Sequence, residues 1–497
     1  MEHLDVLIVG AGLSGIGAGY HVQTKLPGKR YAILESRSEL GGTWSLFRYP
    51  GIRSDSDMYT FGYSFQPWTA EKSISDGDSI LAYLRETASA YGIDRHIRYQ
   101  QRVISATWSS SDAHWLVEVE AGAANERRHY RCTFLYLCCG YYDYDKGHAP
   151  HFPGQDDFAG AIVHPQSWPQ DLDYTGKRIV VIGSGATAVT LVPAMARTAA
   201  HVTMLQRSPT YITSLPAKDA IAKWLRKVLP LRAAYRVARA KNVLLTMFFF
   251  TLSRRRPELF KRLIRAGQKK MLPPDYAYDT HLEPRYQPWD QRLCLVPDGD
   301  LFKAIKAERA QIVTDRIEAI VADGILLESG RTLPADLIVT ATGLTLKAAG
   351  GIRFAVDGSA VDIGKTYTYN GVMLGNVPNL AFCVGYTNAS WTLRADLSSA
   401  FVCRLLAHMD KRGYTHVVAR ADDTALQPPR PLLDFNSGYV LRAVDAFPKQ
   451  SAKRPWLLRQ NYLVDLLNLK FRPIEDGTLA FSRAAAVGFA DAHRATP

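Results

Sequence analysis

Short apolar runs that end in glycine-rich turns recur along the chain, each followed by a stretch with helical periodicity. Residues 5–9 form one such run, and Gly10, Gly12 and Gly15 follow it in the spacing G-x-G-x-x-G. A second strand is predicted over residues 31–34, and the runs at 179–182 and 202–205 repeat the arrangement. Strand, glycine turn, helix and strand form the pattern of a dinucleotide-binding unit. The chain is therefore predicted to be an α/β protein with two Rossmann-like domains.

The first of these units predicts a specific role for each small residue. Gly10 permits the tight turn, Gly12 lets the backbone approach a pyrophosphate, and Gly15 lets the following helix pack closely. Glu35 ends the next strand, where a carboxylate can accept hydrogen bonds from the ribose hydroxyls of an adenosine.

The second unit reads Gly183-Ser184-Gly185-Ala186-Thr187-Ala188, with Ala188 in the third small position. The strand after it ends in Gln206-Arg207-Ser208 where an NAD site would have an acid. A guanidinium at Arg207 suits the 2′-phosphate of NADP, whereas the alternative is an ordinary surface arginine.

A basic helical region is predicted between residues 217 and 271, with an apolar run at 243–252, VLLTMFFFTL. Ten residues are too few to cross a bilayer, which takes about 20. Either the run is the buried face of a helical subdomain, which we favour, or it dips into a membrane interface while arginines meet lipid phosphates. Nucleic-acid binding has no motif beneath the charge and is not expected.

These elements predict a division of the chain into interleaved parts. A first FAD-type part covers residues 1–144, an NADP-type part 145–212, the helical insertion 213–286, the second NADP-type part 287–345 and the second FAD-type part with the C-terminal region 346–497.

Composition adds limits to this scheme. The 497 residues carry 60 basic and 47 acidic side chains, a formal charge of +13 that favours anionic partners such as phosphorylated cofactors. The six cysteines have neither disulfide-scaffold nor metal spacing, and no metal site is expected. The N-terminal residues enter a strand directly, so we expect no secretion signal and a reducing cytoplasmic location.

Residues 48–57, RYPGIRSDSD, combine two arginines and two aspartates with glycine and proline. A ligand-facing loop and a solvated turn with surface ion pairs explain this composition equally well.

The stretch 158–169, FAGAIVHPQSWP, lies between the two glycine-rich units. Phe158, Gly160, His164 and Trp168 match the signature F-x-G-x-x-x-H-x-x-x-W, and the chain resembles the type I Baeyer–Villiger flavin monooxygenases. The phrases GGTWSLFRYPGIRSDSDMYTFGYSFQPW, PWDQRLCLVPDGDLF and VGYTNASWTLRAD resemble the ethionamide-activating subgroup nearly from end to end.

The resemblance implies FAD in the first unit and NADPH in the second. In this family hydride passes to FAD, the reduced flavin captures O2 as a C4a-peroxide, and this attacks a ketone to give an ester or lactone. Sulfides and thiocarbonyls are implied as further substrates.

The resemblance also implies residue roles. Arg292 matches the active-site arginine and Asp55 the acid that pairs with it, while His164 is implied as a positioning residue beside the nicotinamide nucleotide. Gln291 stands where many relatives have a lysine that reads the 2′-phosphate, so NADPH preference is expected to depend more on Arg207. The implied cofactor contacts include Gly42, Thr43, Trp44 and Val103 for FAD, and Ser184, Thr187, Ser208 and Gln291 for NADP.

Three other classes of protein share parts of this pattern. A disulfide reductase needs a cysteine pair at the flavin, and the adjacent Cys138 and Cys139 at a predicted strand end are awkward for that chemistry. A flavin N- or S-monooxygenase differs mainly in pocket shape. A flavin-binding protein of the membrane surface is the non-enzymatic alternative, suggested by the basic helical region.

Overall fold

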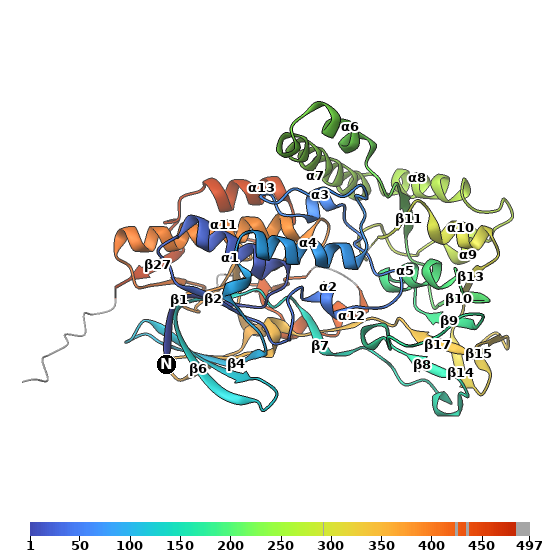
Figure 1. Cartoon of the computed structure of the whole chain (residues 1–497), viewed down its shortest axis with the longest axis horizontal. Coiled ribbons are helices and arrows are strands. Elements are labelled where there is room, and N and C mark those ends of the chain that lie inside the picture. Colours follow the sequence, from blue (N-terminus) through green and yellow to red (C-terminus); the bar gives the residue numbers. More distant parts are fainter. Residues whose placement is uncertain (292, 423–425, 434–436, 484–497) are drawn as a thin grey trace, which may run out of the picture.

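The computed structural model describes residues 1–291, 293–422, 426–433 and 437–483. Figure 1 shows a larger α/β part that contains the N-terminus, a second sheet region beside it, and helices α6–α8 along the upper edge.

The first part is built on an eleven-stranded sheet whose parallel centre carries the first glycine turn. Strand β1 (Glu2–Val9) lies between β2 (Tyr31–Leu34) and β6 (Glu126–Leu137) and is parallel to both. The helices α1 (Leu13–Lys25), α4 (Gly77–Ala90) and α11 (Trp391–Arg412) lie on one side of this centre (Figure 1). The main strand order is β20 (Ser359–Val361), β19 (Arg353–Val356), β4 (Gln101–Ser109), β5 (His114–Ala121), β6, β1, β2 and β3 (Ile97–Arg98). Three further strands join the sheet through the pairing of β23 (Leu380–Phe382) with β6: these are β23, β22 (Met373–Leu374) and β21 (Thr368–Tyr369).

Strands β4, β5 and β6 pair antiparallel and form one flank of this sheet. Their inward positions alternate with exposed ones, and Trp108 and Trp115 are fully buried in the core beneath them. This alternation follows from a sheet with one covered and one partly solvated face.

The second part has a five-stranded parallel sheet in the order β13 (Ala310–Thr314), β10 (His201–Gln206), β9 (Arg178–Ile182), β17 (Leu337–Thr340) and β8 (Ala161–Val163). The central strands are almost entirely buried because both faces are covered, which explains their continuous apolar sequences. Helices α5 (Ala186–Met195) and α10 (Asp300–Lys306) pack in the core on one face, and the small sheet of β14 (Ile317–Val321), β15 (Gly324–Leu327) and β16 (Thr332–Pro334) packs on the other. The fold class predicted from the sequence is confirmed.

Two neighbouring strands carry the chain between the two parts. Strand β7 (Tyr142–Gly147) leads out of the first part, β18 (Leu344–Leu346) leads back, and the two pair antiparallel. The stretch 158–169 lies beside them and contains a strand of its own, β8, at the edge of the second sheet. This strand was not predicted from the sequence, because three apolar residues among glycines and prolines give no strand signal.

The helical insertion consists of α6 (Ala220–Val228), α7 (Leu231–Arg255), α8 (Pro257–Lys269) and the short α9 (Tyr278–His281). The favoured prediction that residues 243–252 form a buried face is wrong for four of them. Leu244, Leu245, Phe248 and Phe249 are 44–58% exposed. The buried side chains of α7 lie mainly in its first half, between Ala234 and Val243. No helix within the described residues has the length and apolarity needed to span a bilayer.

Candidate functional site

A cavity of about 850 Å³ is lined by both glycine-rich turns. It is also lined by residues from the loop 48–57, from the segment after strand β10 and from the C-terminal region. Of the residues predicted from the sequence, those that line it are Gly10, Gly12, Glu35, Gly42, Thr43, Trp44, Asp55, Val103, Gly183, Ser184, Gly185, Thr187, Arg207 and Gln291. Gly15, Ala188, Ser208 and His164 lie outside its lining.

The first glycine turn has the close contacts that its spacing predicts. Gly10 has φ +100°, and a Cβ there would lie 2.7 Å from the carbonyl oxygen of Cys138. A Cβ on Gly15 would lie 1.8 Å from the carbonyl oxygen of Gly10, so only glycine lets α1 begin this close to β1. Gly12 faces the cavity, with Gly42 as its nearest neighbour. Gly15 therefore acts through packing, as expected.

Glu35 is placed to orient the turn as well as a ligand. Its side chain is 4% exposed, accepts hydrogen bonds from the backbone N–H groups of Ala11 (2.8 Å) and Arg37 (2.9 Å), and borders the cavity. The carboxylate is thereby held in one orientation at the cavity wall.

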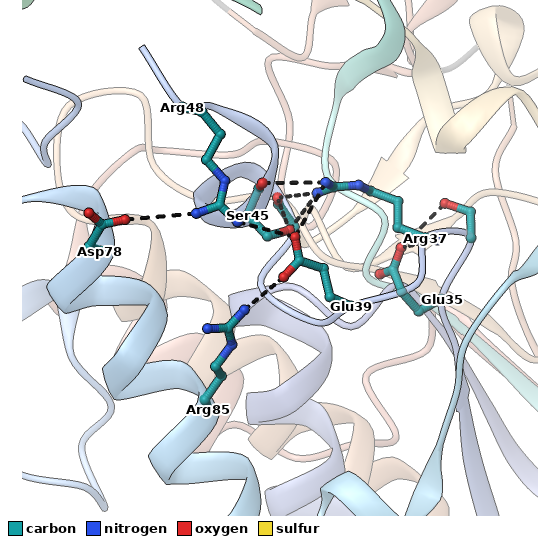
Figure 2. A network of polar contacts seen from close by, with 9 residues as sticks. Glu35, Arg37, Glu39, Ser45, Arg48, Asp78 and Arg85 are labelled. Atoms are coloured by element: carbon teal, nitrogen blue, oxygen red, sulfur yellow. Dashed lines mark hydrogen bonds and ion pairs between the residues drawn. The ribbon is translucent and has the colours of Figure 1, made fainter. Parts of the chain in front are cut away.

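Arg37 is a cavity residue that the sequence reasoning missed. Its guanidinium donates to Ser45 Oγ and to the carbonyl oxygens of Gly42 and Ser45, both at 3.3 Å. Figure 2 shows this group directed toward both Ser45 and the carboxylate of Glu39, with Glu35 nearby. The signal available in the sequence was its position two residues after the strand-end acid, where a cation can face the same nucleotide.

The second glycine turn is open on its ligand side. Gly183 has φ +132°, and a Cβ there would lie 2.3 Å from the carbonyl oxygen of Ala341, whereas Gly185 has no heavy atom within 4 Å of a Cβ position. Ala188 is fully buried in the core of the second part. The third small residue thus serves packing, and Gly185 leaves space for a phosphate group.

Strand β10 ends beside this turn, and the residues at its end differ in burial: one is buried and the next faces the cavity. Gln206 is buried and donates to His281 O and Thr314 Oγ1, both at 2.8 Å. Arg207 is exposed and lines the cavity, and among the described residues no ion pair or hydrogen bond holds its guanidinium. Ser208 accepts from Ser184 Oγ at 3.5 Å through its carbonyl oxygen.

The loop 48–57 combines both predicted alternatives. Arg48 forms ion pairs with Glu39 (3.2 Å) and Asp78 (3.8 Å) outside the cavity (Figure 2). Asp57 caps helix α3 (Met58–Phe61) by accepting from two backbone N–H groups. Arg53 and Asp55, by contrast, line the cavity.

Arg53 connects the two parts of the molecule. Its guanidinium pairs with both carboxylate oxygens of Asp300 at the start of α10, and Nη2 also lies 3.5 Å from the carbonyl oxygen of Val189 in α5. Only 13% of the Arg53 side chain and 25% of the Asp300 side chain are exposed.

His164 contacts the two crossing strands instead of the cavity. Its Nδ1 accepts a hydrogen bond from the backbone N–H of Gln166 at 3.2 Å. The proton is therefore on Nε2, which donates to the carbonyl oxygen of Gly343 at 3.3 Å. A Cβ on Gly147 would lie 2.0 Å from the imidazole ring. Burial lowers the pKa of His164 despite the opposing effect of the Gly343 hydrogen bond, so the ring is neutral at pH 7.

Arg292 lies outside the described residues. The preceding Gln291 lines the cavity, and the loop before it is attached to α7. Phe250 meets Trp289 edge to face with ring centroids 5.6 Å apart, and Arg254 donates to Asp290 at 2.7 Å.

Further lining residues carried no sequence signal because they lie far from the glycine turns. Tyr144 has its hydroxyl 3.4 Å from Thr43 Oγ1, and burial raises its pKa to about 12. Tyr386 donates to Asp465 at 2.8 Å, and that carboxylate is paired with the fully buried Arg394. Arg442 also faces the cavity, and burial lowers its pKa.

Two Rossmann-like sheets share one cavity, and the strand after the glycine turn is followed by an acid in one and by an arginine in the other. This arrangement is typical of flavoprotein oxidoreductases that bind two dinucleotides. Residues 61–227 match the flavin-binding monooxygenase-like family, and residues 8–71 match the NAD(P)-binding Rossmann-like domain.

Curated relatives cover almost the whole chain. It is 53% identical over 489 residues to the FAD-containing monooxygenase EthA of Mycobacterium tuberculosis, covering 98% of this chain and 99% of the relative. It is 46% identical over 483 residues to the probable FAD-binding monooxygenase AlmA of Acinetobacter baylyi, covering 97% of each. The chain belongs to the EthA family of FAD-containing monooxygenases.

Solved structures show the same fold at lower identity. An oxidized steroid monooxygenase bound to NADP superposes with a TM-score of 0.73 at 22% identity, covering 97% of this chain and all of that one. An open cyclohexanone monooxygenase gives 0.72 at 20% identity, covering 86% and 91%. The predicted family, fold and flavoprotein monooxygenase class are confirmed, and the FAD and NADP prediction agrees with these relatives.

Proposed function

We propose that the protein is an NADPH-consuming Baeyer–Villiger monooxygenase, which converts a ketone, O2, NADPH and a proton into an ester or lactone, NADP⁺ and water. Sulfides and thiocarbonyls are proposed as further substrates. The observation that carries the proposal is the single cavity shared by Glu35, Asp55, Arg207 and Gln291. Bound FAD supplies the oxygen activation, and NADPH supplies the hydride.

The charge chemistry is assigned to Arg292 and Asp55. Oxygen transfer to a carbonyl develops negative charge, which a permanently protonated guanidinium stabilises. In this proposal Arg292 approaches the reacting oxygen, while the Asp55 carboxylate orients that guanidinium from the cavity wall. The cavity position of Gln291, the residue before Arg292, supports this role.

Two variants test the chemistry. Arg292→Ala should keep bound FAD, visible as a yellow protein, but form no ester from cyclic, linear or aryl ketones when products are analysed by mass. Arg292→Lys keeps the charge without the fork geometry and should recover only part of the rate. Ester formation by the alanine variant would remove Arg292 from the mechanism.

NADPH selection is assigned to Arg207. A charge-assisted contact with the 2′-phosphate contributes about 1.5–3 kcal/mol, so Arg207→Ala should raise KM for NADPH by about 10–100-fold and leave KM for NADH nearly unchanged. Arg197→Ala, an exposed arginine of the same part that lies outside the cavity lining, is the matched control. Equal losses with both nucleotides would refute the assignment.

A flavin N- or S-monooxygenase without ketone activity remains the second candidate, because Tyr386, Tyr144 and Arg442 give the cavity wall polar groups suited to several substrates. Product analysis on matched ketones, thioethers and amines distinguishes the two. We place the protein in the cytoplasm, since all six cysteines are free thiols, as a reducing compartment would keep them.

A further inference from the structure

Helix α6 turns large apolar side chains toward solvent. Ile221, Trp224 and Val228 are 53–58% exposed and are spaced by three and four residues, so they share one face of the helix. The adjoining side of the helix carries the buried Ala222 and Leu225, and α6 packs against α7. The apolar surface of α6 is therefore wider than the part that the rest of the protein covers.

Helix α7 continues the pattern. Val237, Leu244 and Phe248 fall on one face through spacings of seven and four, and Leu245 and Phe249 adjoin them, all between 44% and 58% exposed. In α8, Leu259 and Leu263 are likewise about half exposed. Figure 1 shows these three helices along one edge of the molecule. We call this set of exposed side chains on α6, α7 and α8 the apolar edge.

Hydrogen bonds and an ion pair on the inner side of α7 fix the orientation of this helix. Arg239, on the inner side of α7, donates to the carbonyl oxygens of Tyr59 (2.8 Å) and Gly62 (2.6 Å) and pairs with Asp396 at 3.5 Å. Tyr235 donates to the carbonyl oxygen of Tyr63 at 2.9 Å. Since α7 cannot rotate without losing these bonds, its outer side chains have no place in the core.

Positive charge accompanies the apolar edge. Residues 217–271 contain sixteen basic and two acidic side chains. Lys223, Lys227, Arg232 and Arg236 are exposed on the same α6–α7 hairpin. A second copy of the chain meeting this face symmetrically would bring like charges together, which is unfavourable. Nucleic acid would accept the charges but would leave the Phe and Leu side chains without apolar partners.

We propose that the apolar edge docks on an anionic lipid bilayer. Lipid phosphates would accept the lysines and arginines, and the apolar side chains would enter the boundary between headgroups and acyl chains. The aromatic Trp224, Phe248 and Phe249 have the amphipathic or bulky character that this depth favours. Docking is peripheral, because no described helix is long and apolar enough to span the bilayer.

Flotation of the purified FAD-loaded protein with vesicles tests the proposal. We expect the protein to float with vesicles of phosphatidylcholine and phosphatidylglycerol, to float weakly with phosphatidylcholine alone, and to be released by salt. The double variant Phe248→Ser/Phe249→Ser should lower the partition coefficient by at least about tenfold, and Arg232→Glu/Arg236→Glu should do the same for anionic vesicles only.

Phe471→Ser is the matched control, since Phe471 is 64% exposed beside a lysine but lies outside the insertion. FAD absorbance confirms that each variant is folded. The proposal is overturned if the wild type does not bind anionic vesicles, or if the Phe471 variant loses binding as strongly as the double variant. It is also overturned if light scattering shows a wild-type oligomer that Phe248→Ser/Phe249→Ser dissociates while vesicle binding is unchanged.

Discussion

The ion pair between Arg53 and Asp300 joins the two nucleotide-binding parts, and Asp300→Asn perturbs it with little change of shape. Asp300 lies outside the cavity lining, so its replacement reaches a bound nucleotide only through Arg53 and the position of α10. Asparagine keeps an acceptor for the backbone N–H of Leu301 but removes the charge.

The geometry bounds the size of the effect. Exposed ion pairs contribute about 0.2–1 kcal/mol, and removal of one partner from a buried pair costs about 3–5 kcal/mol. With side chains 13% and 25% exposed, this pair lies between those limits, and we expect a coupling of about 1–2 kcal/mol. If the pair holds the parts in the register that binds NADP⁺, its loss lowers the fraction of competent molecules and weakens NADP⁺ affinity by about 5–30-fold.

A double-mutant cycle with Arg53→Ala and Asp300→Asn, read by titration calorimetry with NADP⁺, measures the coupling. The double variant should bind no more weakly than the Arg53→Ala variant. Asp336→Asn is the matched control, because its partner Arg178 lies in the same part and both side chains are 39–51% exposed. Unchanged affinity in Asp300→Asn would refute the reasoning, and so would tighter binding, which would mean that Asp300 chiefly repels the phosphates.

Three further outcomes follow. His164→Ala should weaken NADP⁺ binding and uncouple NADPH oxidation from product formation, with FAD content unchanged; unaltered coupling would make His164 a plain connector residue. Gly15→Ala should prevent FAD loading because its Cβ would overlap a backbone oxygen, whereas Gly185→Ala should fold normally, as purification with absorbance will show. The hydrogen bonds and charge of Arg178 lower the pKa of Asp336 to about 2, below its unfolded value of about 3.9. The stabilisation from this pair is therefore present above about pH 4 and is lost as pH falls through 2. Asp336→Asn should remove this contribution to the pH dependence of the free energy of unfolding.

The strands and glycine turns could be predicted from the sequence because local patterns determine them. Residues 31–34 form β2 as expected, and the turns of Gly10 and Gly183 have the positive φ values that their positions required. The resemblance added the family, which local patterns could not supply.

The partners of the arginines in the loop 48–57 could not be predicted from the neighbouring sequence. Arg48 and Arg53 have similar neighbours in sequence, yet one pairs with Glu39 on the outside and the other with Asp300 across the cavity. Arg53 contacts Asp300 directly, at the start of α10, and Asp300 is 247 positions away in the sequence. Tyr386 was missed for the same reason, because its partner Asp465 lies 79 positions away. The exposure of residues 244, 245, 248 and 249 likewise depends on which other elements cover α7.

The two parts are held in register by backbone geometry as much as by charge. Strands β7 and β18 cross between the parts side by side, and His164 occupies the space that a side chain at residue 147 would need while bonding to Gly343. A rotation of the second part must therefore break this contact or the Arg53–Asp300 pair. Burial lowers the pKa of His164, so its imidazole is neutral at pH 7 and the contact with Gly343 does not depend on charge. The Arg53–Asp300 contact does depend on charge, and Arg53 lines the cavity. We therefore expect the Arg53–Asp300 pair to be more sensitive than the His164 contact to the phosphate charges of a bound nucleotide.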